Sequence, residues 1–448
     1  GSFIEGDGEI EINTGATLTW TNGNMRGTGT TTIKPGGTFV LGGVGTKIIN
    51  DGRTINNYGT CNLTSSVTGS LAFGASVQFN NYGTFNINSG ADFAVVGGVV
   101  APAFNNMVGG IVNKNDVDTT SLTSPNRLNN YGTFNVNAGI FTLNSSVGVH
   151  SGIYNVTSQG RLNGTGNMNF TGSTFTNNGE VSMSAISFSG TALQTIAGNG
   201  SFSNVTFNNA SGFTLTDSPL LKTSVSWTNG ILTCAGRVIL SDGITQTSTA
   251  NCWVNGIIEY IIGSGLISRV ATFEIGDATS KAKMQLSFPA ISGPGSIIAR
   301  TVAGDDVNIS TAGMNPAKTV NRTWSVTNSG TSFTTYQSTL NWNAADEDAG
   351  VNYNNYNVSL YSNGSWVAQS ILSRSTNSIQ SNGGQIALGE FQIGEPCAPT
   401  GDYRSVTSGD WGNPLTWEEY NGCSWIPAVS APSASSNVIT IRNGNNVN

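Results

Sequence analysis

The sequence feature that most constrains the fold is a short internal repeat. The pentapeptide Asn-Asn-Tyr-Gly-Thr begins at residues 56, 80 and 129, so its copies are 24 and 49 residues apart. The second interval is close to two periods, and the pair Asn105-Asn106 marks the weaker copy between them. A period of about 24 residues is typical of repeat architectures in which each unit packs only against its neighbours.

Alternating apolar and polar residues follow each strong copy of the repeat. The sequence reads Thr-Phe-Asn-Ile-Asn at 84–88 and Thr-Phe-Asn-Val-Asn at 133–137. Alternation bounded by Gly and Asn predicts a short strand with one buried face. Several such strands per repeat predict an all-β fold whose residues 1–250 form a right-handed parallel β-helix, or β-solenoid. We expect about ten turns, stacked about 4.8 Å apart.

Stacking should place equivalent residues of successive turns above one another. Phe85 and Phe134 are therefore expected in internal aromatic stacks. Gly59, Gly83 and Gly132 are expected to supply positive φ angles at the corners. The asparagine pairs and tyrosines are expected to form ladders along the axis. The ladder residues are Asn56, Asn57, Tyr58, Asn80, Asn81, Tyr82, Asn129, Asn130 and Tyr131.

The residue pattern of the chain changes after residue 250. Residues 251–396 contain longer alternating segments separated by Gly, Asn and Asp turns, which predicts a β-sandwich domain. Residues 397–448 contain three tryptophans, Trp411, Trp417 and Trp425. We interpret this last segment as a Trp-rich cap followed by the first strand of a further β-helical module.

Composition excludes some classes of partner. Only 10% of the residues are charged, and the net charge is −7. Because the chain has no basic stripe, nucleic acid is not an expected partner. No apolar run reaches the roughly 18 residues of a membrane span. The chain begins with Gly1 and has no signal peptide, so we interpret it as a processed product or an excised fragment.

The five cysteines are Cys61, Cys234, Cys252, Cys397 and Cys423. An odd number leaves at least one without a partner in the chain. In an oxidising compartment, Cys397–Cys423 and Cys234–Cys252 are candidate disulfides. Buried free thiols are an equal alternative for Cys61 and Cys234.

Catalysis by a β-helix would need clustered carboxylates or a proton-abstracting base. Asp116 and Asp118 would share a face of an alternating strand, but a solvated loop is the preferred interpretation. Glu9 and Glu11 are expected to be exposed strand charges. His150 is the only histidine, has no nearby acid in the sequence, and is expected in a turn. We therefore predict that the chain is not an enzyme.

Two oxygen-rich turns are candidate calcium sites, because Ca²⁺ binds through many oxygen ligands. They contain Asp305 with Asp306, and Asp346 with Asp348. Neither turn has the spacing of an EF-hand loop, and acidic turns without an ion are the alternative interpretation. Calcium is the one cofactor considered, and its role would be structural.

Several motifs occur in a characteristic order. The repetitive region is followed by short motifs at 253–256, 273–277 and 321–324, then by Glu-Phe-Gln-Ile-Gly-Glu-Pro at 390–396 and a Trp-rich segment at 403–425. This order resembles the long repetitive surface proteins of Bacteroidetes and related bacteria. In that family, a segment similar to 403–425 opens a β-helical module.

The resemblance implies an extracellular location, reached often by the type IX secretion route and ending in display at the bacterial cell surface. It also implies roles in adhesion, gliding or extracellular filaments. Such proteins carry a C-terminal sorting domain that this sequence lacks, and their modules recur in tandem. The implied partners are neighbouring copies or modules of the same protein, together with surface glycans.

Two functional hypotheses follow. The first is a structural or adhesive extracellular module of a giant repetitive surface protein or filament. The second is a carbohydrate-binding or polysaccharide-cleaving β-helix, in which the recurring tyrosines could stack on sugars. An enzyme should have a groove with converging carboxylates, whereas a stalk should have uncharged polar ladders on its faces. The scarcity of charge favours the stalk.

Overall fold

The structure, a computed structural model, describes residues 3–97, 100–145, 147–263, 265 and 267–448. The fold is all-β, with 56% of residues in strands and 3% in helices. The chain divides into two compact units, Gly1–Ile262 and Gly263–Asn448. Each unit is described by itself.

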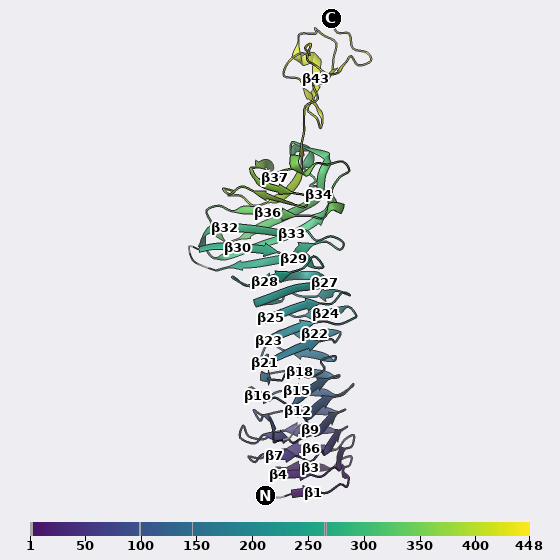
Figure 1. The fold of residues 1–448 in the computed structure, drawn as a ribbon, viewed down its shortest axis with the longest axis vertical. Helices are drawn as coiled ribbons and strands as arrows, with labels where there is room; N and C mark the ends of the chain where they lie inside the picture. Colours follow the sequence, from purple (N-terminus) through teal and green to yellow (C-terminus); the bar gives the residue numbers. More distant parts are fainter. Residues whose placement is uncertain (1–2, 98–99, 146, 264, 266) are drawn as a thin grey trace. The chain divides into compact units, whose positions relative to one another are not determined.

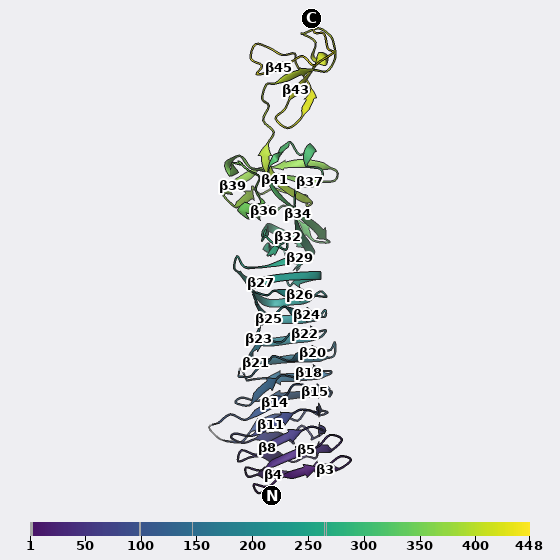
Figure 2. The ribbon, with the colours of Figure 1, turned by 90° about the vertical axis from the view of Figure 1, so that its right-hand side faces the viewer.

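The first unit is a parallel β-solenoid of about 13 turns (Figures 1 and 2). The prediction of about ten turns was too low because the repeat becomes shorter along the chain. Asn56 pairs with Asn80, 24 residues later, whereas Phe134 pairs with Tyr154, only 20 residues later. A shorter repeat places more turns in the same length of sequence.

Each turn in the first half contributes one strand to each of three parallel stacks. The first stack contains β1 (Phe3–Glu5), β4 (Gly23–Arg26), β7 (Lys47–Ile49), β10 (Leu71–Phe73), β13 (Phe93–Val95), β16 (Thr119–Leu122) and β19 (Gly139–Leu143). The second contains β2 (Ile10–Ile12), β5 (Thr30–Ile33), β8 (Thr54–Asn57), β11 (Gln78–Asn81), β14 (Ala103–Asn106) and β17 (Arg127–Asn130). The third contains β3 (Thr17–Trp20), β6 (Thr38–Leu41), β9 (Thr60–Leu63), β12 (Thr84–Ile87), β15 (Ile111–Lys114), β18 (Thr133–Val136), β20 (Ile153–Val156), β22 (Thr174–Asn177), β24 (Gln194–Ala197) and β26 (Phe213–Leu215).

Longer strands continue the stacks in the second half. They are β21 (Gly160–Phe170), β23 (Glu180–Phe188), β25 (Ser201–Asn208), β27 (Leu220–Leu240) and β29 (Cys252–Ile262), and the short strand β28 (Thr245–Ser248) pairs with β27. Strand β29 still pairs in parallel with β27, with Leu232 opposite Val254. The parallel stacking therefore continues beyond residue 250, to the end of the first unit at Ile262.

Aromatic rings fill much of the solenoid interior. Phe134, Tyr154 and Phe175 form a stack of nearly parallel rings, with 5.6 Å between successive centroids. Phe85 is also fully buried, but its register partner in the next turn is Val112. Its aromatic contacts within the core are edge-on or tilted. The predicted stack is interrupted by the aliphatic side chain of Val112.

The repeated glycines have a different role from the one predicted. Gly59, Gly83 and Gly132 are not among the residues with positive φ. A Cβ atom on Gly132 would lie closer than 3.0 Å to the backbone oxygen of Gly110, one turn earlier, and Gly83 has the same relation to Gly59. These glycines are needed because successive turns approach too closely for any side chain.

The second unit contains two antiparallel sheets with a sandwich-like arrangement. One sheet has the order β33 (Gly295–Ala303), β34 (Met314–Ser329), β41 (Glu390–Pro396), β37 (Asn357–Ser362) and β38 (Ser365–Gln369). The other has the order β30 (Ile267–Phe273), β32 (Met284–Gly293), β36 (Gln337–Asn341), β40 (Ser378–Ser381) and β39 (Ile371–Ser375), with β35 (Ser332–Phe333) beside β32. The remaining elements of this region are β31 (Ile275–Gly276) and the 3-10 helices η1 (Ile309–Thr311), η2 (Ala344–Asp346) and η3 (Tyr353–Asn355).

The Trp-rich segment forms a small sheet of its own. Its elements are β42 (Tyr403–Ser405), η4 (Pro414–Thr416), β43 (Trp417–Tyr420), β44 (Trp425–Pro427) and β45 (Ile439–Thr440). Strand β45 pairs with β42 in parallel, and Trp417 is buried against Trp411 with 5.0 Å between ring centroids. Its role as a cap and first strand of another module stays a prediction.

The described part of the chain contains one disulfide. Cys397 and Cys423 form a disulfide across 26 residues. The candidate disulfide Cys234–Cys252 is wrong, because Cys252 lies opposite Gly230 while Cys234 lies beside Gly256. An offset of four residues along neighbouring strands separates the two by about 13 Å, and a disulfide needs Cα atoms within about 7 Å.

Candidate functional site

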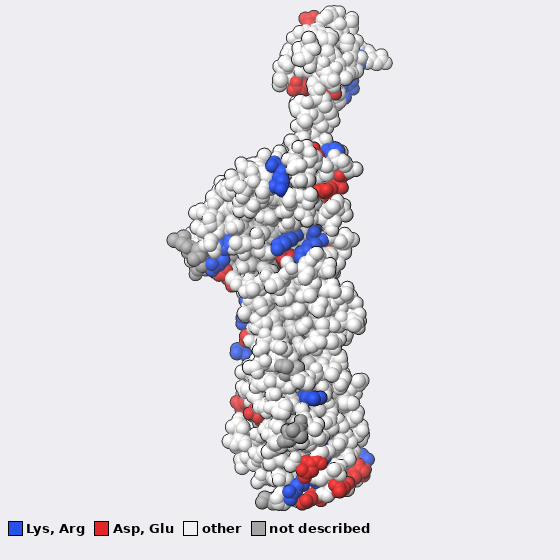
Figure 3. Space-filling view, viewed as in Figure 1, with Lys and Arg blue, Asp and Glu red and all other residues white. Residues whose placement is uncertain are grey.

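Charged side chains are sparse on the face of the molecule seen in Figure 3. Acidic side chains gather near the N-terminal end of the first unit, where Glu5, Asp7, Glu9 and Glu11 are all exposed. Most of the polar groups of the first unit are uncharged amides and hydroxyls. The asparagine ladders are therefore the first candidate for a functional feature of this unit.

An inner ladder connects four buried asparagines of the second stack. The Nδ2 atom of Asn57 donates to Oδ1 of Asn81 at 2.7 Å, Asn81 donates to Asn106 at 2.8 Å, and Asn106 donates to Asn130 at 2.7 Å. Each Nδ2 also donates to a backbone carbonyl, such as that of Thr133 for Asn106. Every amide hydrogen of Asn106 is therefore used inside the protein, where water does not compete.

Outer ladders follow the solvent-facing side of the turns. Asn129 donates to Asn105 at 2.7 Å, and Asn105 donates to Asn80 at 2.8 Å, so the outer ladder runs in the opposite direction to the inner one. Two further ladders were not predicted. They are Asn62–Asn86–Asn113–Asn135–Asn155 and Asn88–Asn115–Asn137. The alternating asparagines of 84–88 and 133–137 were the signal that could have predicted them.

The inner and outer ladders of one turn offer a matched test. Replacing Asn106 with Leu should lower the free energy of unfolding of the solenoid by about 2 kcal/mol, because Asn130 and the Thr133 carbonyl lose a buried donor. Replacing its neighbour Asn105 with Leu should cost less than about 1 kcal/mol, because water can reach the outer ladder. Urea unfolding combined with hydrogen exchange of peptides from 78–136 measures both. Equal losses would contradict a special role for the inner ladder.

His150 occupies the next position of the inner ladder after Asn130, with which it forms a bridge. The prediction that His150 lies in a turn is therefore wrong. Its side chain is only 3% exposed, and Nδ1 lies 2.7 Å from Oη of Tyr154. Burial lowers the pKa of His150 to about 4. The imidazole is neutral at pH 7 and its side-chain partner is the buried hydroxyl of Tyr154.

Acidification should destabilise the solenoid through His150. The unfolded chain binds a proton near pH 6.5 but the folded chain does so only near pH 4, so stability is lost as pH falls between these values. The loss should reach about 2 kcal/mol at pH 5. His150→Gln keeps a polar group beside Tyr154 but cannot titrate, so it should lose less stability between pH 7 and pH 5. Urea midpoints at both pH values measure this, and parallel losses in the two proteins would contradict it.

The repeated tyrosines form a short corner stack. The rings of Tyr58 and Tyr82 are stacked at 4.6 Å with an angle of 9°. Met107 takes the equivalent place in the next turn, and Tyr131 is 38% exposed one turn further on. Because stacked rings cover each other's faces, Tyr58 and Tyr82 leave little open ring surface between them for a sugar.

The acidic pairs of the first unit lie in local hydrogen bonds and ion pairs. Asp116 and Asp118 lie in the loop between β15 and β16, and the Asp118 backbone nitrogen donates to Asp116 at 2.8 Å. Glu9 accepts a hydrogen bond from Thr32, and Glu11 forms an ion pair with Lys34 at 2.7 Å. The side chains of Asp116, Glu9 and Glu11 each have a partner within the first unit.

The four calcium candidates of the second unit lie in an internal polar network. Arg322 donates from Nη2 to Asp346 Oδ1 at 2.8 Å and from Nε to Asp346 Oδ2 at 3.1 Å, so both Asp346 oxygens are engaged. Arg322 also donates to Asp277 at 2.8 Å. Asp346 is therefore one side of a buried ion pair and does not fit a calcium ligand.

Asp305 and Asp348 are brought together by Thr319. Its hydroxyl lies 2.7 Å from Asp305 Oδ1 and 3.2 Å from Asp348 Oδ2. Burial raises the pKa of Asp305, whereas hydrogen bonds from Asn321 and Thr319 outweigh burial and lower the pKa of Asp348. Asp306 instead accepts from Asn308. Within the described ranges, no group of three His, Cys, Asp or Glu side chains could hold a metal ion, and calcium at Asp305 and Asp348 stays a prediction.

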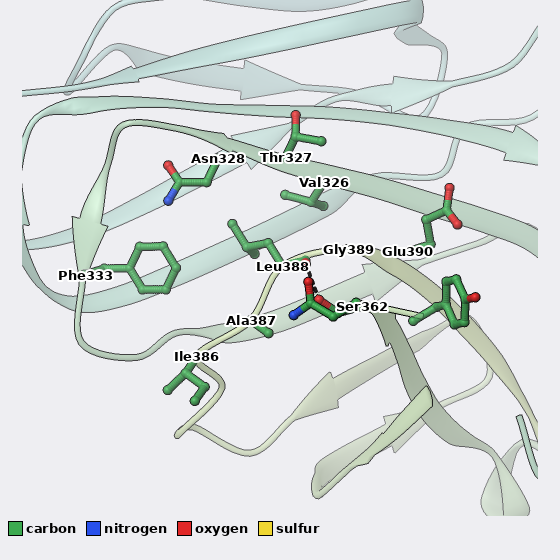
Figure 4. A pocket seen from close by; sticks show the side chains of 12 residues that line it. Val326, Thr327, Asn328, Phe333, Ser362, Ile386, Ala387, Leu388, Gly389 and Glu390 are labelled. Atoms are coloured by element: carbon green, nitrogen blue, oxygen red, sulfur yellow. Dashed lines mark hydrogen bonds between the residues drawn. The ribbon is translucent and has the colours of Figure 1, made fainter. Parts of the chain in front are cut away.

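A pocket of about 620 Å³ lies in the second unit (Figure 4). It begins where β34 and β41 separate, just after the last bond between Val326 N and Gly389 O at 2.9 Å. The segment 386–389, the start of β41 and the turn between β37 and β38 line it together with the end of β34 and Phe333. Nothing in the sequence pattern predicted this pocket, because its walls come from four separate parts of the chain.

No protein-family model matches the chain, and neither a curated protein nor a solved structure is significantly similar to it.

Proposed function

We propose that this chain is a structural module of a large repetitive protein displayed outside a bacterial cell, where it serves as a stalk or filament segment without catalysis. The observation that carries the proposal is the continuity of the asparagine ladders and close-packed glycines from turn to turn. These repeated features stabilise the contact between each turn and the next, and they do not mark one local site along the solenoid.

The ladders suit a load-bearing role for a physical reason. In a solenoid each turn contacts only its neighbours, so the interface between adjacent turns sets its resistance to opening. Here the parallel backbone pairing is supplemented by side-chain hydrogen bonds, as between Asn81 and Asn106. Amide ladders carry no net charge, so their strength should depend little on salt or pH.

The proposal also includes the outside of the cell as the location, as the resemblance to repetitive Bacteroidetes surface proteins suggests. The disulfide between Cys397 and Cys423 agrees with an oxidising compartment. Neighbouring modules of the same protein are the proposed structural partners. In the parts of the chain that the structure describes, no helix has the length and apolar character needed to cross a membrane.

Carbohydrate binding is the second candidate function. It is favoured by the pocket of the second unit, which combines aromatic, apolar and hydrogen-bonding side chains. Binding of this kind would be compatible with an adhesive stalk, because one unit could supply length while the other supplies contact.

Antibodies against the purified chain would test the stalk proposal on cells that produce the protein. Immunogold electron microscopy of intact and sheared cells should place the label on the outer surface, along rods or filaments. Gels of the sheared material should show a species much larger than the 46.5 kDa of this chain. A label confined to the cell interior, or a compact secreted protein of about this mass, would overturn the proposal.

A further inference from the structure

The pocket of the second unit has two chemically different ends (Figure 4). Phe333 and Ile386 lie at one end, Glu390 lies at the other, and Leu388 and Val326 lie between them. Ile386 is 75% exposed, which is high for a side chain of this size and polarity. The pocket is therefore amphipathic: the end with Phe333 and Ile386 is apolar and exposed, and the opposite end with Glu390 is polar.

Five of the six polar side chains that line the pocket are neutral. The side-chain polar atoms of Thr327, Tyr361 and Asn363 make no hydrogen bond to the protein within the described residues. Glu390 accepts from Ser325 at 3.3 Å and shares a hydrogen bond with Asp306. None of the lining residues is Lys or Arg, and Arg300 is a nearby cation outside the lining. These groups offer hydroxyl and amide hydrogen bonds together with one carboxylate acceptor, which suits an uncharged ligand rich in hydroxyl groups.

The residues that carry these groups are held rigidly. Asn363 and Gly364 form a two-residue hairpin turn with φ angles of 51° and 80°, as tight hairpins require. The hydroxyl of Ser362 donates to the Leu388 carbonyl at 3.1 Å and fixes the hairpin to the opposite wall. Tyr361 packs against Trp366 with 5.1 Å between ring centroids. Such preorganisation lowers the entropic cost of binding.

We infer that this pocket binds a neutral saccharide unit that carries an N-acetyl group. The acetyl methyl would contact Phe333, Ile386 and Leu388, and the sugar hydroxyls would bond to Glu390, Tyr361 and Asn363. The volume of about 620 Å³ lies within the range of ligand pockets and suits one or two sugar rings. The inference rests on the proposed extracellular role only in that such glycans are found outside cells.

Other ligands fit these features less well. An anionic saccharide would meet the carboxylate of Glu390 with no cation among the lining residues to balance it. A fully hydroxylated sugar would leave the apolar end in contact with water or would bury hydroxyl groups without partners. Both ligands therefore serve as comparisons in the test.

Isothermal titration of the full chain with two matched trisaccharides tests the inference. The probes are the β-1,4-linked trimer of N-acetylglucosamine and the β-1,4-linked trimer of glucose. The acetylated trimer should bind about fourfold more tightly, because one buried methyl group contributes about 0.8 kcal/mol. A polyuronic trimer should show no binding.

Variants then locate the site. Tyr361→Ala should weaken binding about tenfold, and Ile386→Asp should remove the preference for the acetylated trimer. Ile386 is exposed, so its replacement leaves the core intact and keeps the test valid if Tyr361→Ala fails to fold. Tyr131→Ala, an exposed tyrosine of the solenoid, is the matched control and should bind normally.

The inference is overturned if the wild-type chain binds neither neutral trimer, or if it prefers the unacetylated or acidic one. It is also overturned if Ile386→Asp leaves the preference unchanged or if Tyr131→Ala abolishes binding. None of these results bears on the stalk proposal, which depends on location and particle size measured on cells.

Discussion

Arg322→Met should lower the free energy of unfolding of the second unit by about 3 to 5 kcal/mol, a loss expected when one partner of a buried ion pair is removed. Arg322 is fully buried and is the common partner of Asp277 and Asp346. Methionine fills much of the same space but leaves two carboxylates without their cation. The loss should therefore come from uncompensated charge rather than from a cavity.

Urea unfolding at pH 7 and pH 4 measures this effect. Hydrogen bonds from Thr279, Ser280 and Arg322 outweigh burial and lower the pKa of Asp277 to about 2, so in the wild type its contribution is present above pH 4 and is lost as the pH falls toward 2. In the variant Asp277 loses the hydrogen bond from Arg322, so its pKa should rise and the deficit of the variant should shrink at pH 4. Arg300→Met, at an exposed position, is the control. A deficit that is independent of pH would point to packing instead.

Gly132→Val should destabilise the solenoid by about 3 kcal/mol or more, because a side chain there forces adjacent turns apart. Its Cβ would lie closer than 3.0 Å to the Gly110 carbonyl oxygen, which accepts the Thr133 amide hydrogen at 2.9 Å. Backbone atoms on both sides cannot move without breaking the pairing of β15 with β18. The substitution should therefore cost a hydrogen bond as well as strain.

Gly8→Val provides the matched control, because a Cβ on Gly8 meets nothing within 4 Å and its φ is ordinary. Hydrogen exchange of peptides from 106–156 should show lost protection in Gly132→Val and little change in Gly8→Val. If both variants are as stable as the wild type, close approach of the turns is not what requires glycine at this position.

The fold of the first unit could be predicted because residues that are one repeat apart in the sequence contact each other in neighbouring turns. Asn56 and Asn80 are one turn apart and Asn129 follows two turns later, so spacing alone implied that they are stacked. The number of turns could not be predicted, because after Asn130 the ladder positions pass to His150 and Phe170 and the motif disappears while the stacking continues.

The errors at individual residues have physical causes that a single sequence does not reveal. The role of Gly132 depends on how closely two turns approach, which its flanking residues do not encode. Cys234 and Cys252 are close in sequence, but the register of β27 and β29 sets them apart. The buried partners of Asp346 and the walls of the pocket come from distant segments, so no local pattern could predict them.

The inner ladder has one further consequence, which concerns how such a chain can change in length. Asn81 and Asn106 make the same bonds on both sides, so a whole turn can be removed or copied between them and the new neighbours still meet as donor and acceptor. Only the two ends of the ladder, at Asn57 and Asn130, differ from the rest. Gene duplication could therefore lengthen or shorten the solenoid in steps of one turn, and its length could evolve separately from the second unit.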